Sequence, residues 1–242
     1  MIRFKTTRLT VAVAVAATLI VALGGLATAS NMGFKLNKQL FPFVTGVSGD
    51  NWIALPYNSP YGTWADLCTQ TGLRPGATTG ALITHIDQNN NVATNLRCGT
   101  TQANVAIPSD GRGFRVRQTA PVPAPFIVVG SHNTGRLIDI KKFCSNPAAA
   151  GCAGTPTTGQ GNFWFAYPYH TTAVTIADLC TSMGLTPGAT TGALITRINP
   201  ATNGATNVRC GTSGATTANL VLGEAIRIRE QNQRIGIRPA HF

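Results

Sequence analysis

A tandem repeat limits what this chain can fold into. The stretch TWADLCTQTGLRPGATTGALITHI…ATNLRCGT, residues 63–100, returns as TIADLCTSMGLTPGATTGALITRI…ATNVRCGT at 175–212. At a constant offset of 112, 27 of the 38 positions are identical, and the alignment needs no gap. Repetition of this kind predicts two copies of one folded unit. With 242 residues, 43% of them hydrophobic, the chain is long enough to bury two small cores.

The first 29 residues carry the features of a signal peptide. Three basic residues precede an apolar run over 9–26, and Ala-Thr-Ala at 27–29 is the small-x-small pattern that signal peptidase cleaves. The apolar run also reaches the lower limit for a membrane span, so an uncleaved anchor is the alternative. We expect residues 1–29 to be removed on export, leaving no membrane span. The mature chain is then expected to be extracellular or on the cell surface, with the periplasm as the other exported location.

The six cysteines fit that export route. An even count of cysteines in an exported chain favours disulfides over free thiols. A bridge within each repeat is the simplest arrangement that both copies can share, which predicts three bridges: Cys68–Cys98, Cys180–Cys210 and Cys144–Cys152. A structural zinc site is the competing interpretation, but the chain has no C-x-x-C pair and its histidines do not recur at the repeat offset.

These features divide the chain into four segments. They are a signal peptide at 1–29, a first β-rich repeat unit at 30–133, a connecting segment with a local disulfide at 134–161, and a second β-rich repeat unit at 162–242. The predicted fold class is mainly β with one short α-helix per repeat. Each of the two tandem, disulfide-stapled units is expected to be a small, mostly antiparallel β-barrel or sandwich.

The strongest local signal in each copy is a helix. A Thr-x-x-Asp capping box opens it and a glycine suited to a left-handed C-terminus closes it: Thr63, Asp66 and Gly72 in the first copy, Thr175, Asp178 and Gly184 in the second. The spacing predicts a helix of about nine residues whose cysteine faces inward.

Strands are expected around these helices. Alternating or continuous apolar runs bounded by turn residues predict them in the first copy at 33–37, 51–57, 81–86, 93–98, 113–117 and 126–130, and in the second at 136–141, 162–169, 193–198, 205–210, 225–229 and 234–238.

The sequence offers no recognisable catalytic set. The only acidic residue kept in both copies is the capping aspartate, and no Gly-x-Ser-x-Gly turn is present. The loop DQNNN at 87–91 has oxygen-bearing residues but lacks the glycine and glutamate of a calcium loop, and a hairpin turn explains it better. We therefore expect no enzyme activity, no cofactor and no metal.

Four arginines carry the main signal outside the predicted core. They are Arg115, Arg117, Arg227 and Arg229, and they alternate with apolar residues, which places them on the solvent face of their strands. Such a stripe is either merely solvated or holds an anionic polysaccharide or another envelope component. Nucleic acid is not expected, because the chain is exported and no aromatic residue interleaves with the arginines.

Several short motifs resemble a class of uncharacterised exported bacterial repeat proteins. They are Leu-Pro-Tyr at 55–57, Ala-Asp-Leu-Cys at 65–68, Cys-Gly at 98–99, Gly-x-x-Phe-Arg-Val-Arg at 111–117 and Val-Gly-Ser-His at 129–132. The second copy departs from the pattern, with Tyr167 in place of Leu55. The resemblance implies a small, mostly β, disulfide-bonded surface module, and it brings no activity or site.

Two functional hypotheses follow. The first is an exported structural protein that associates with copies of itself in a cell-surface layer, fibre or envelope coat. A strand-like mature N-terminus supplies a mechanism, since a free segment comprising Gly33, Phe34, Lys35, Leu36 and Asn37 could complete a neighbour's sheet. The alternative is an adhesin-like surface module that binds a glycan or an anionic envelope polymer at two similar sites.

Overall fold

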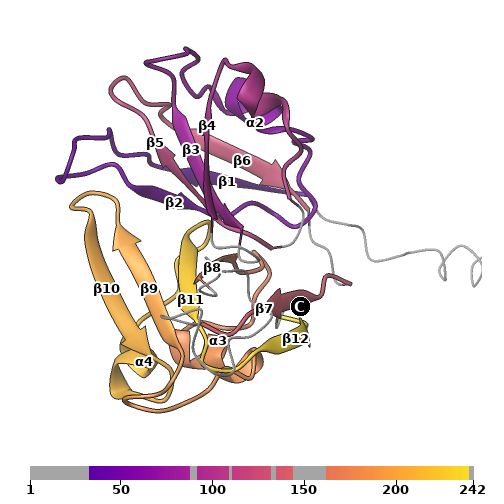
Figure 1. Ribbon diagram of the computed structural model, residues 1–242, viewed down its shortest axis with the longest axis vertical. Helices are drawn as coiled ribbons and strands as arrows, with labels where there is room; N and C mark the ends of the chain where they lie inside the picture. Colours follow the sequence, from indigo (N-terminus) through magenta and orange to yellow (C-terminus); the bar gives the residue numbers. More distant parts are fainter. Residues whose placement is uncertain (1–32, 88–91, 109–110, 132–134, 144–161, 240–242) are drawn as a thin grey trace, which may run out of the picture. The chain divides into compact units, whose positions relative to one another are not determined.

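Two four-stranded antiparallel sheets, one in each repeat, are the main elements of the structure (Figure 1). The computed structural model describes residues 33–87, 92–108, 111–131, 135–143 and 162–239. In the first repeat the strand order is β2 (Asn51–Ile53), β5 (Phe114–Arg117), β3 (Leu82–Asp87), β4 (Val92–Arg97). In the second it is β8 (Asn162–Ala166), β11 (Ala225–Arg229), β9 (Leu194–Asn199), β10 (Gly204–Arg209). The predicted β-rich fold of two similar units is confirmed.

A two-stranded antiparallel sheet accompanies each of these. In the first repeat β1 (Phe34–Lys38) pairs with β6 (Phe126–Gly130). In the second, β7 (Ile138–Ile140) pairs with β12 (Arg234–Ile237). The strand expected over 136–141 is thus present as β7, and it serves the second repeat.

The predicted capping boxes are formed in both helices, α2 (Trp64–Thr71) and α3 (Ile176–Ser182). The Asp66 amide donates to Thr63 Oγ1 at 3.1 Å, and the Thr63 amide donates to the Asp66 carboxylate at 2.8 Å. Thr175 and Asp178 make the same pair of bonds at 3.2 and 2.8 Å. Gly72 follows α2 with a left-handed φ of 71°. The helix signals in the sequence therefore describe the structure to within about a turn.

Two further helical segments were not expected from the sequence. They are a 3₁₀ turn, η1 (Thr101–Asn104), and a short helix, α4 (Ser213–Thr217), at the equivalent place in the second repeat. Their sequences, TQAN and SGATT, are polar and too short to show an apolar period, so periodicity carries no signal there. One alanine in each, Ala103 or Ala215, is buried in the core of its repeat.

Each repeat has its own core, enclosed by the four-stranded sheet, the helix and the two-stranded sheet. In the first repeat Ile83 and Val116 of the larger sheet, Leu67 of α2 and Val128 of β6 are fully buried in one cluster. In the second repeat Phe165 and Ile195 of the larger sheet, Leu179 of α3 and Ile138 of β7 form the equivalent cluster. The two predicted disulfides, Cys68–Cys98 and Cys180–Cys210, are formed and join each helix to the end of β4 or β10.

The turn before the third strand of each repeat occurs in both copies, and an arginine holds it in place in each. An ideal Cβ at Gly80 would lie 2.4 Å from the Gly76 carbonyl oxygen, so only glycine fits where the chain crosses itself. The Arg97 guanidinium donates to Gly80 O at 3.0 Å and holds this turn on β4. Arg209 and Gly192 repeat the contact at 2.8 Å, so these two arginines have a structural role.

Candidate functional site

The alternation predicted for the arginine strands is confirmed, but the solvent exposure predicted for the arginines is wrong. Phe114 and Val116 of β5 point into the first core, as expected. The side chains of Arg115 and Arg117 lie on the opposite face, where they are only 20% and 29% exposed. Arg115 lies over Trp164 of the other repeat, and Arg117 is covered by Asp50 and Phe43 of its own repeat, contacts that strand alternation alone does not reveal.

Arg117 and Arg229, one in each repeat, are held by neighbouring side chains. The Arg117 guanidinium makes two hydrogen bonds to the Asp50 carboxylate and lies over the Phe43 ring at 4.7 Å. Arg229 donates to Asn162 Oδ1 at 2.6 Å and lies over the Phe143 ring at 4.8 Å. Since the cationic groups already have an acceptor and an aromatic face, they offer little to an external anion.

Arg115 and Arg227 belong to a hydrogen-bonded chain that is the same in both repeats. Arg115 Nη2 donates to Thr84 Oγ1 at 3.2 Å, and the Thr84 hydroxyl donates to Asn95 Oδ1 at 2.7 Å. Arg227, Thr196 and Asn207 repeat both bonds at the same two distances. These chains tie β5 to β3 and β4, and β11 to β9 and β10, on the face turned toward the other repeat.

Tryptophans stand beside these arginines, which corrects the expectation that no aromatic residue interleaves with them. Trp52 is the register partner of Arg115 and Trp164 is the register partner of Arg227. The two tryptophan rings stack on each other at 4.8 Å between centroids, and both residues are buried. The Arg115 guanidinium lies 5.8 Å from the centre of the Trp164 ring. Arg115 and the two tryptophans therefore lie in the contact between the repeats.

That contact is reciprocal, as in a twofold dimer. Tyr57 Oη donates to Ala166 O at 2.8 Å, while Tyr169 Oη donates to Ala54 O at 2.6 Å, and both pairs of residues are related by the offset of 112. The Ala54 amide donates to Gly223 O at 3.0 Å, and the Ala166 amide donates to Gly111 O at 2.8 Å. The two repeats thus contact each other through the same surface of each.

The reciprocal contact covers one edge of each large sheet. Isolated bridges join Ile53 of β2 to Glu224, and Phe165 of β8 to Arg112. At the opposite edges, β4 and β10 have a neighbouring strand on one side only among the described strands. Most of their residues are exposed, with Leu96 and Val208 the buried exceptions. In the part of the chain that the structure describes, each repeat therefore presents one open sheet edge.

The remaining predicted site residues fall in two groups. Cys144 and Cys152, the third expected disulfide, lie outside the described residues. The expected strand-donor segment, Gly33 to Asn37, overlaps β1, which pairs with β6 of the same chain from Phe34 to Lys38. The segment is therefore not free in this structure, and it would have to leave β6 before it could complete a sheet elsewhere.

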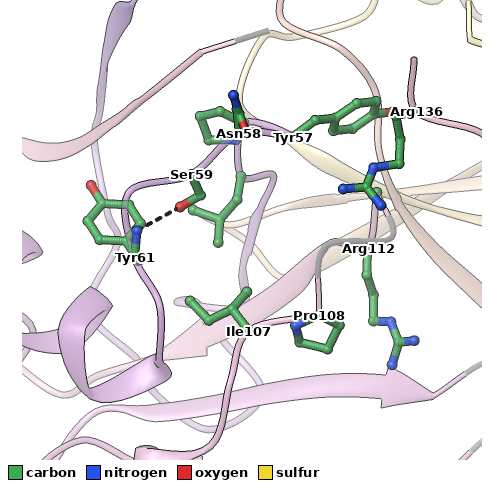
Figure 2. A pocket seen from close by; sticks show the side chains of 11 residues that line it. Tyr57, Asn58, Ser59, Tyr61, Ile107, Pro108, Arg112 and Arg136 are labelled. Atoms are coloured by element: carbon green, nitrogen blue, oxygen red, sulfur yellow. Dashed lines mark hydrogen bonds between the residues drawn. The ribbon is translucent and has the colours of Figure 1, made fainter. Parts of the chain in front are cut away.

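A pocket of about 270 Å³ lies in the first repeat beside the contact between the repeats. Ser59 and Tyr61 of the segment after β2 lie on one side of it and Arg112 and Arg136 on the other, with the Tyr57 ring beside Arg136 (Figure 2). The floor carries Ile107 and Pro108. Neither arginine is among the four that the sequence indicated. The sequence signal that could have indicated this site is a charge difference between the copies: the counterpart of Arg112 in the second repeat is Glu224.

The equivalent region of the second repeat contains an ion pair. Arg197, which replaces His85, donates to both Glu224 carboxylate oxygens, with the shorter bond at 2.6 Å, and to Asn219 O at 2.7 Å. Asn219 corresponds to Ile107 of the pocket at the repeat offset. Lys38 Nζ donates to the neighbouring Gly223 O at 3.1 Å. The two copies share a framework but differ in charge at this position.

In the described part of the chain no three His, Cys, Asp or Glu side chains lie close enough together to hold a metal ion. No helix of the described residues is long and apolar enough to cross a membrane. Comparisons of the chain with protein-family models, with curated proteins and with solved structures find no match. The resemblance to exported repeat proteins therefore stays a prediction.

Proposed function

We propose that the protein is an exported, non-enzymatic structural subunit that associates with copies of itself through the open edges of β4 and β10. The two disulfides are compatible with export, because such bridges persist in oxidising compartments. The observation that carries the proposal is the pair of exposed six-residue edge strands, one in each repeat. A surface layer, fibre or envelope coat is the assembly that such a subunit would build.

The backbone groups available at these edges can be identified. In an antiparallel pair, residues that exchange hydrogen bonds alternate with residues that do not. The Cys98 amide donates to Ala81 O at 3.0 Å, which fixes the alternation along β4. The N–H and C=O groups of Ala93 and Asn95 therefore point away from β3. In the second repeat the Cys210 amide donates to Ala193 O. The N–H and C=O groups of Ala205 and Asn207 of β10 therefore point away from β9.

The composition of the edges also favours pairing. Proteins that avoid edge-to-edge association place lysine, proline or inward charges on their edge strands. The sequences VATNLR of β4 and GATNVR of β10 carry none of these except the final arginine, which bonds within its own repeat. Because one chain has two such edges, each added copy leaves another edge open, and association can continue.

The alternative is a surface module that binds a glycan or an anionic envelope polymer. The arginine version of this hypothesis loses support, because Arg115, Arg117, Arg227 and Arg229 are engaged within the chain. A ligand-binding role can rest instead on the pocket beside Arg112 and Arg136, and it does not depend on the strand edges.

Proline at the outward positions tests the proposed assembly. Ala93→Pro and Ala205→Pro each remove an N–H that points away from the sheet and leave the hydrogen bonds to β3 and β9 in place. The matched control is the pair Ala93→Ser and Ala205→Ser, which keeps both N–H groups. Sedimentation and negative-stain microscopy of the oxidised chain at several concentrations give the particle size.

We expect the serine double variant to assemble like the original chain and the proline double variant to be monomeric. Each single proline variant retains one edge and should form nothing larger than a dimer. Circular dichroism and non-reducing mass spectrometry establish that the proline variants are folded and oxidised. A folded proline double variant that assembles normally, or an original chain that stays monomeric at high concentration, contradicts the proposal.

A further inference from the structure

We propose that the pocket between the segment after β2 and the arginines Arg112 and Arg136 binds a single anionic sugar residue, a hexuronate, with the carboxylate on the arginine side. This inference is independent of the assembly proposed above, because the pocket lining does not include β4 or β10. It assigns a ligand class to the first repeat alone.

The charge of the pocket points to an anion. Among the described residues, its lining includes two arginines and no acidic side chain. The Nε atom of Arg136 is buried and has no hydrogen-bond partner among the described atoms. A buried guanidinium N–H without an acceptor is costly, and a bound carboxylate would supply that acceptor in a charge-assisted bond. Guanidinium groups suit carboxylates because two parallel N–H groups match the two oxygens.

The rest of the lining suits a sugar ring. Leu55, Ile107 and Pro108 provide apolar surface for the C–H face of a ring, while Asn58 and Ser59 bring polar groups to the same pocket. The Ser59 hydroxyl already accepts from the Tyr61 amide at 3.3 Å, which fixes its position (Figure 2). At about 270 Å³ the pocket is slightly smaller than sites for drug-sized ligands, which start at roughly 300 Å³, so one ring is the matching size.

The side of the pocket formed by Tyr57 and Gly111 is held by the contact between the repeats. The Tyr57 hydroxyl donates to Ala166 O at 2.8 Å, so its proton already has an acceptor and the ligand need not supply one. Gly111 has a φ of 75°, and a Cβ there would lie 2.7 Å from Ile138 Cδ1. Ile138, which belongs to the core of the second repeat, therefore packs directly behind this side of the pocket. A preformed pocket loses less conformational freedom on binding.

The comparison between the copies supports specialisation of this site. Elements that stabilise the fold, such as the caps, disulfides and reciprocal tyrosine bonds, occur in both repeats. The pocket residue Arg112 has Glu224 as its counterpart, and Glu224 is bonded to Arg197. The two copies thus share the framework and differ in charge at this position.

The test measures binding of D-glucuronate to the oxidised full chain by saturation-transfer NMR and calorimetry. Two probes of the same shape without the charge, D-glucose and D-glucuronamide, serve as ligand controls, and acetate supplies the carboxylate without the ring. Arg112→Gln and Arg136→Gln remove one guanidinium each, and the lysine variants at the same positions keep the charge. Lys35→Gln removes a positive charge from the exposed face of β1, outside the pocket, and is the matched control.

We expect glucuronate to bind at least tenfold more tightly than glucose, glucuronamide or acetate. Each glutamine variant should weaken binding by about tenfold or more, the lysine variants should weaken it less, and Lys35→Gln should leave it unchanged. Equal binding of glucuronate and glucuronamide, equal binding of acetate, or an equal loss in Lys35→Gln overturns the proposal. Unchanged thermal unfolding of the glutamine variants shows that a loss of binding is not a loss of fold.

Discussion

Gly113 and Ala225 occupy the same position of the two repeats and meet face to face. A Cβ built on Gly113 would lie 2.3 Å from the Cβ of Ala225, a distance at which two carbon atoms cannot coexist. The Gly113 amide also donates to Trp164 O at 2.6 Å, which holds the backbone of β5 close to β8. The reciprocal contact between the repeats thus has room for one methyl group at its centre and not for two.

The first prediction concerns this methyl group. Gly113→Ala should lower the free energy of unfolding by about 1–3 kcal/mol, because the added carbon overpacks a closed contact. Ala225→Gly should cost less, about 0.5–1 kcal/mol, mainly through the greater freedom of glycine in the unfolded chain. Urea unfolding of the oxidised chain measures both effects.

The double variant, Gly113→Ala with Ala225→Gly, is the control for this prediction. It moves the single methyl group from one repeat to the other, so its stability should lie within about 1 kcal/mol of the original chain, and the cycle should show a large coupling energy. If the two single changes simply add, the contact is not as close as the structure describes.

The second prediction concerns the reciprocal tyrosines. Tyr57→Phe and Tyr169→Phe each leave a carbonyl, Ala166 O or Ala54 O, without its hydroxyl donor. Each change should lower the free energy of unfolding by about 1–2 kcal/mol, and by similar amounts in the two repeats. Denaturant unfolding checks the size, and Tyr61→Phe, whose hydroxyl accepts from the Val129 amide within the first repeat, is a comparison outside the contact. Two very different losses would show that the contact is not equivalent in both directions.

The third prediction concerns the disulfides. Each described bridge spans 30 residues, so replacing Cys68 and Cys98 together by alanine should cost about 3–4 kcal/mol on the chain-entropy estimate. The same replacement at Cys180 and Cys210 should cost a similar amount, because the separation is identical. Unfolding under non-reducing conditions measures the loss, and mass spectrometry shows that the other described bridge remains. A loss below about 1 kcal/mol in either repeat would contradict a stapling role.

The fourth prediction is a pH dependence that comes from Lys38. Burial lowers the pKa of Lys38 from its ordinary 10.5 to about 8, and the attraction of Glu224 only partly offsets this effect. Above pH 8 the folded chain loses this proton while the unfolded chain keeps it, so the free energy of unfolding should rise with pH. Urea unfolding at pH 7.5, 8.5 and about 9.5 should show this rise.

Lys38→Met should flatten that dependence, and Lys35→Met, exposed on the same strand, should retain it. The measurement stops near pH 9.5 because burial raises the pKa of Tyr167 and Tyr169 above the ordinary 10. At higher pH those tyrosines ionise first in the unfolded chain, which lowers stability and obscures the effect of Lys38. An unchanged slope in Lys38→Met would show that another group titrates.

The sequence predicted what depends on neighbouring residues and on repetition. Thr63 and Asp66 are three positions apart, so their capping box can be recognised from the sequence without knowledge of the rest of the fold. The hairpins of β3 with β4 and β9 with β10 follow from alternation around a turn. The pairing Cys68–Cys98 was predictable because the equivalent cysteines of the second copy had to be able to pair in the same way.

The sequence did not predict which face of each sheet contacts the other repeat. Alternation separates Arg115 from Phe114, but it does not say whether the arginine face meets water or protein, and here it meets Trp164 of the other repeat. Arg136 is distant in sequence from Tyr57, and no repeated pattern marks it, so the pocket depends on tertiary structure. The difference between Arg112 and Glu224 was visible, but only the ion pair of Glu224 with Arg197 gives it meaning.

The reciprocal contact also sets how the two halves can change over time. In a dimer of separate identical chains, every substitution at the interface appears twice, so a second methyl group opposite Ala225 could not be avoided. Joined in one chain, the halves stay together at any dilution, because their encounter is intramolecular. Each half is then free to acquire residues that the other does not carry, and one copy can take on a new task while its twin preserves the scaffold.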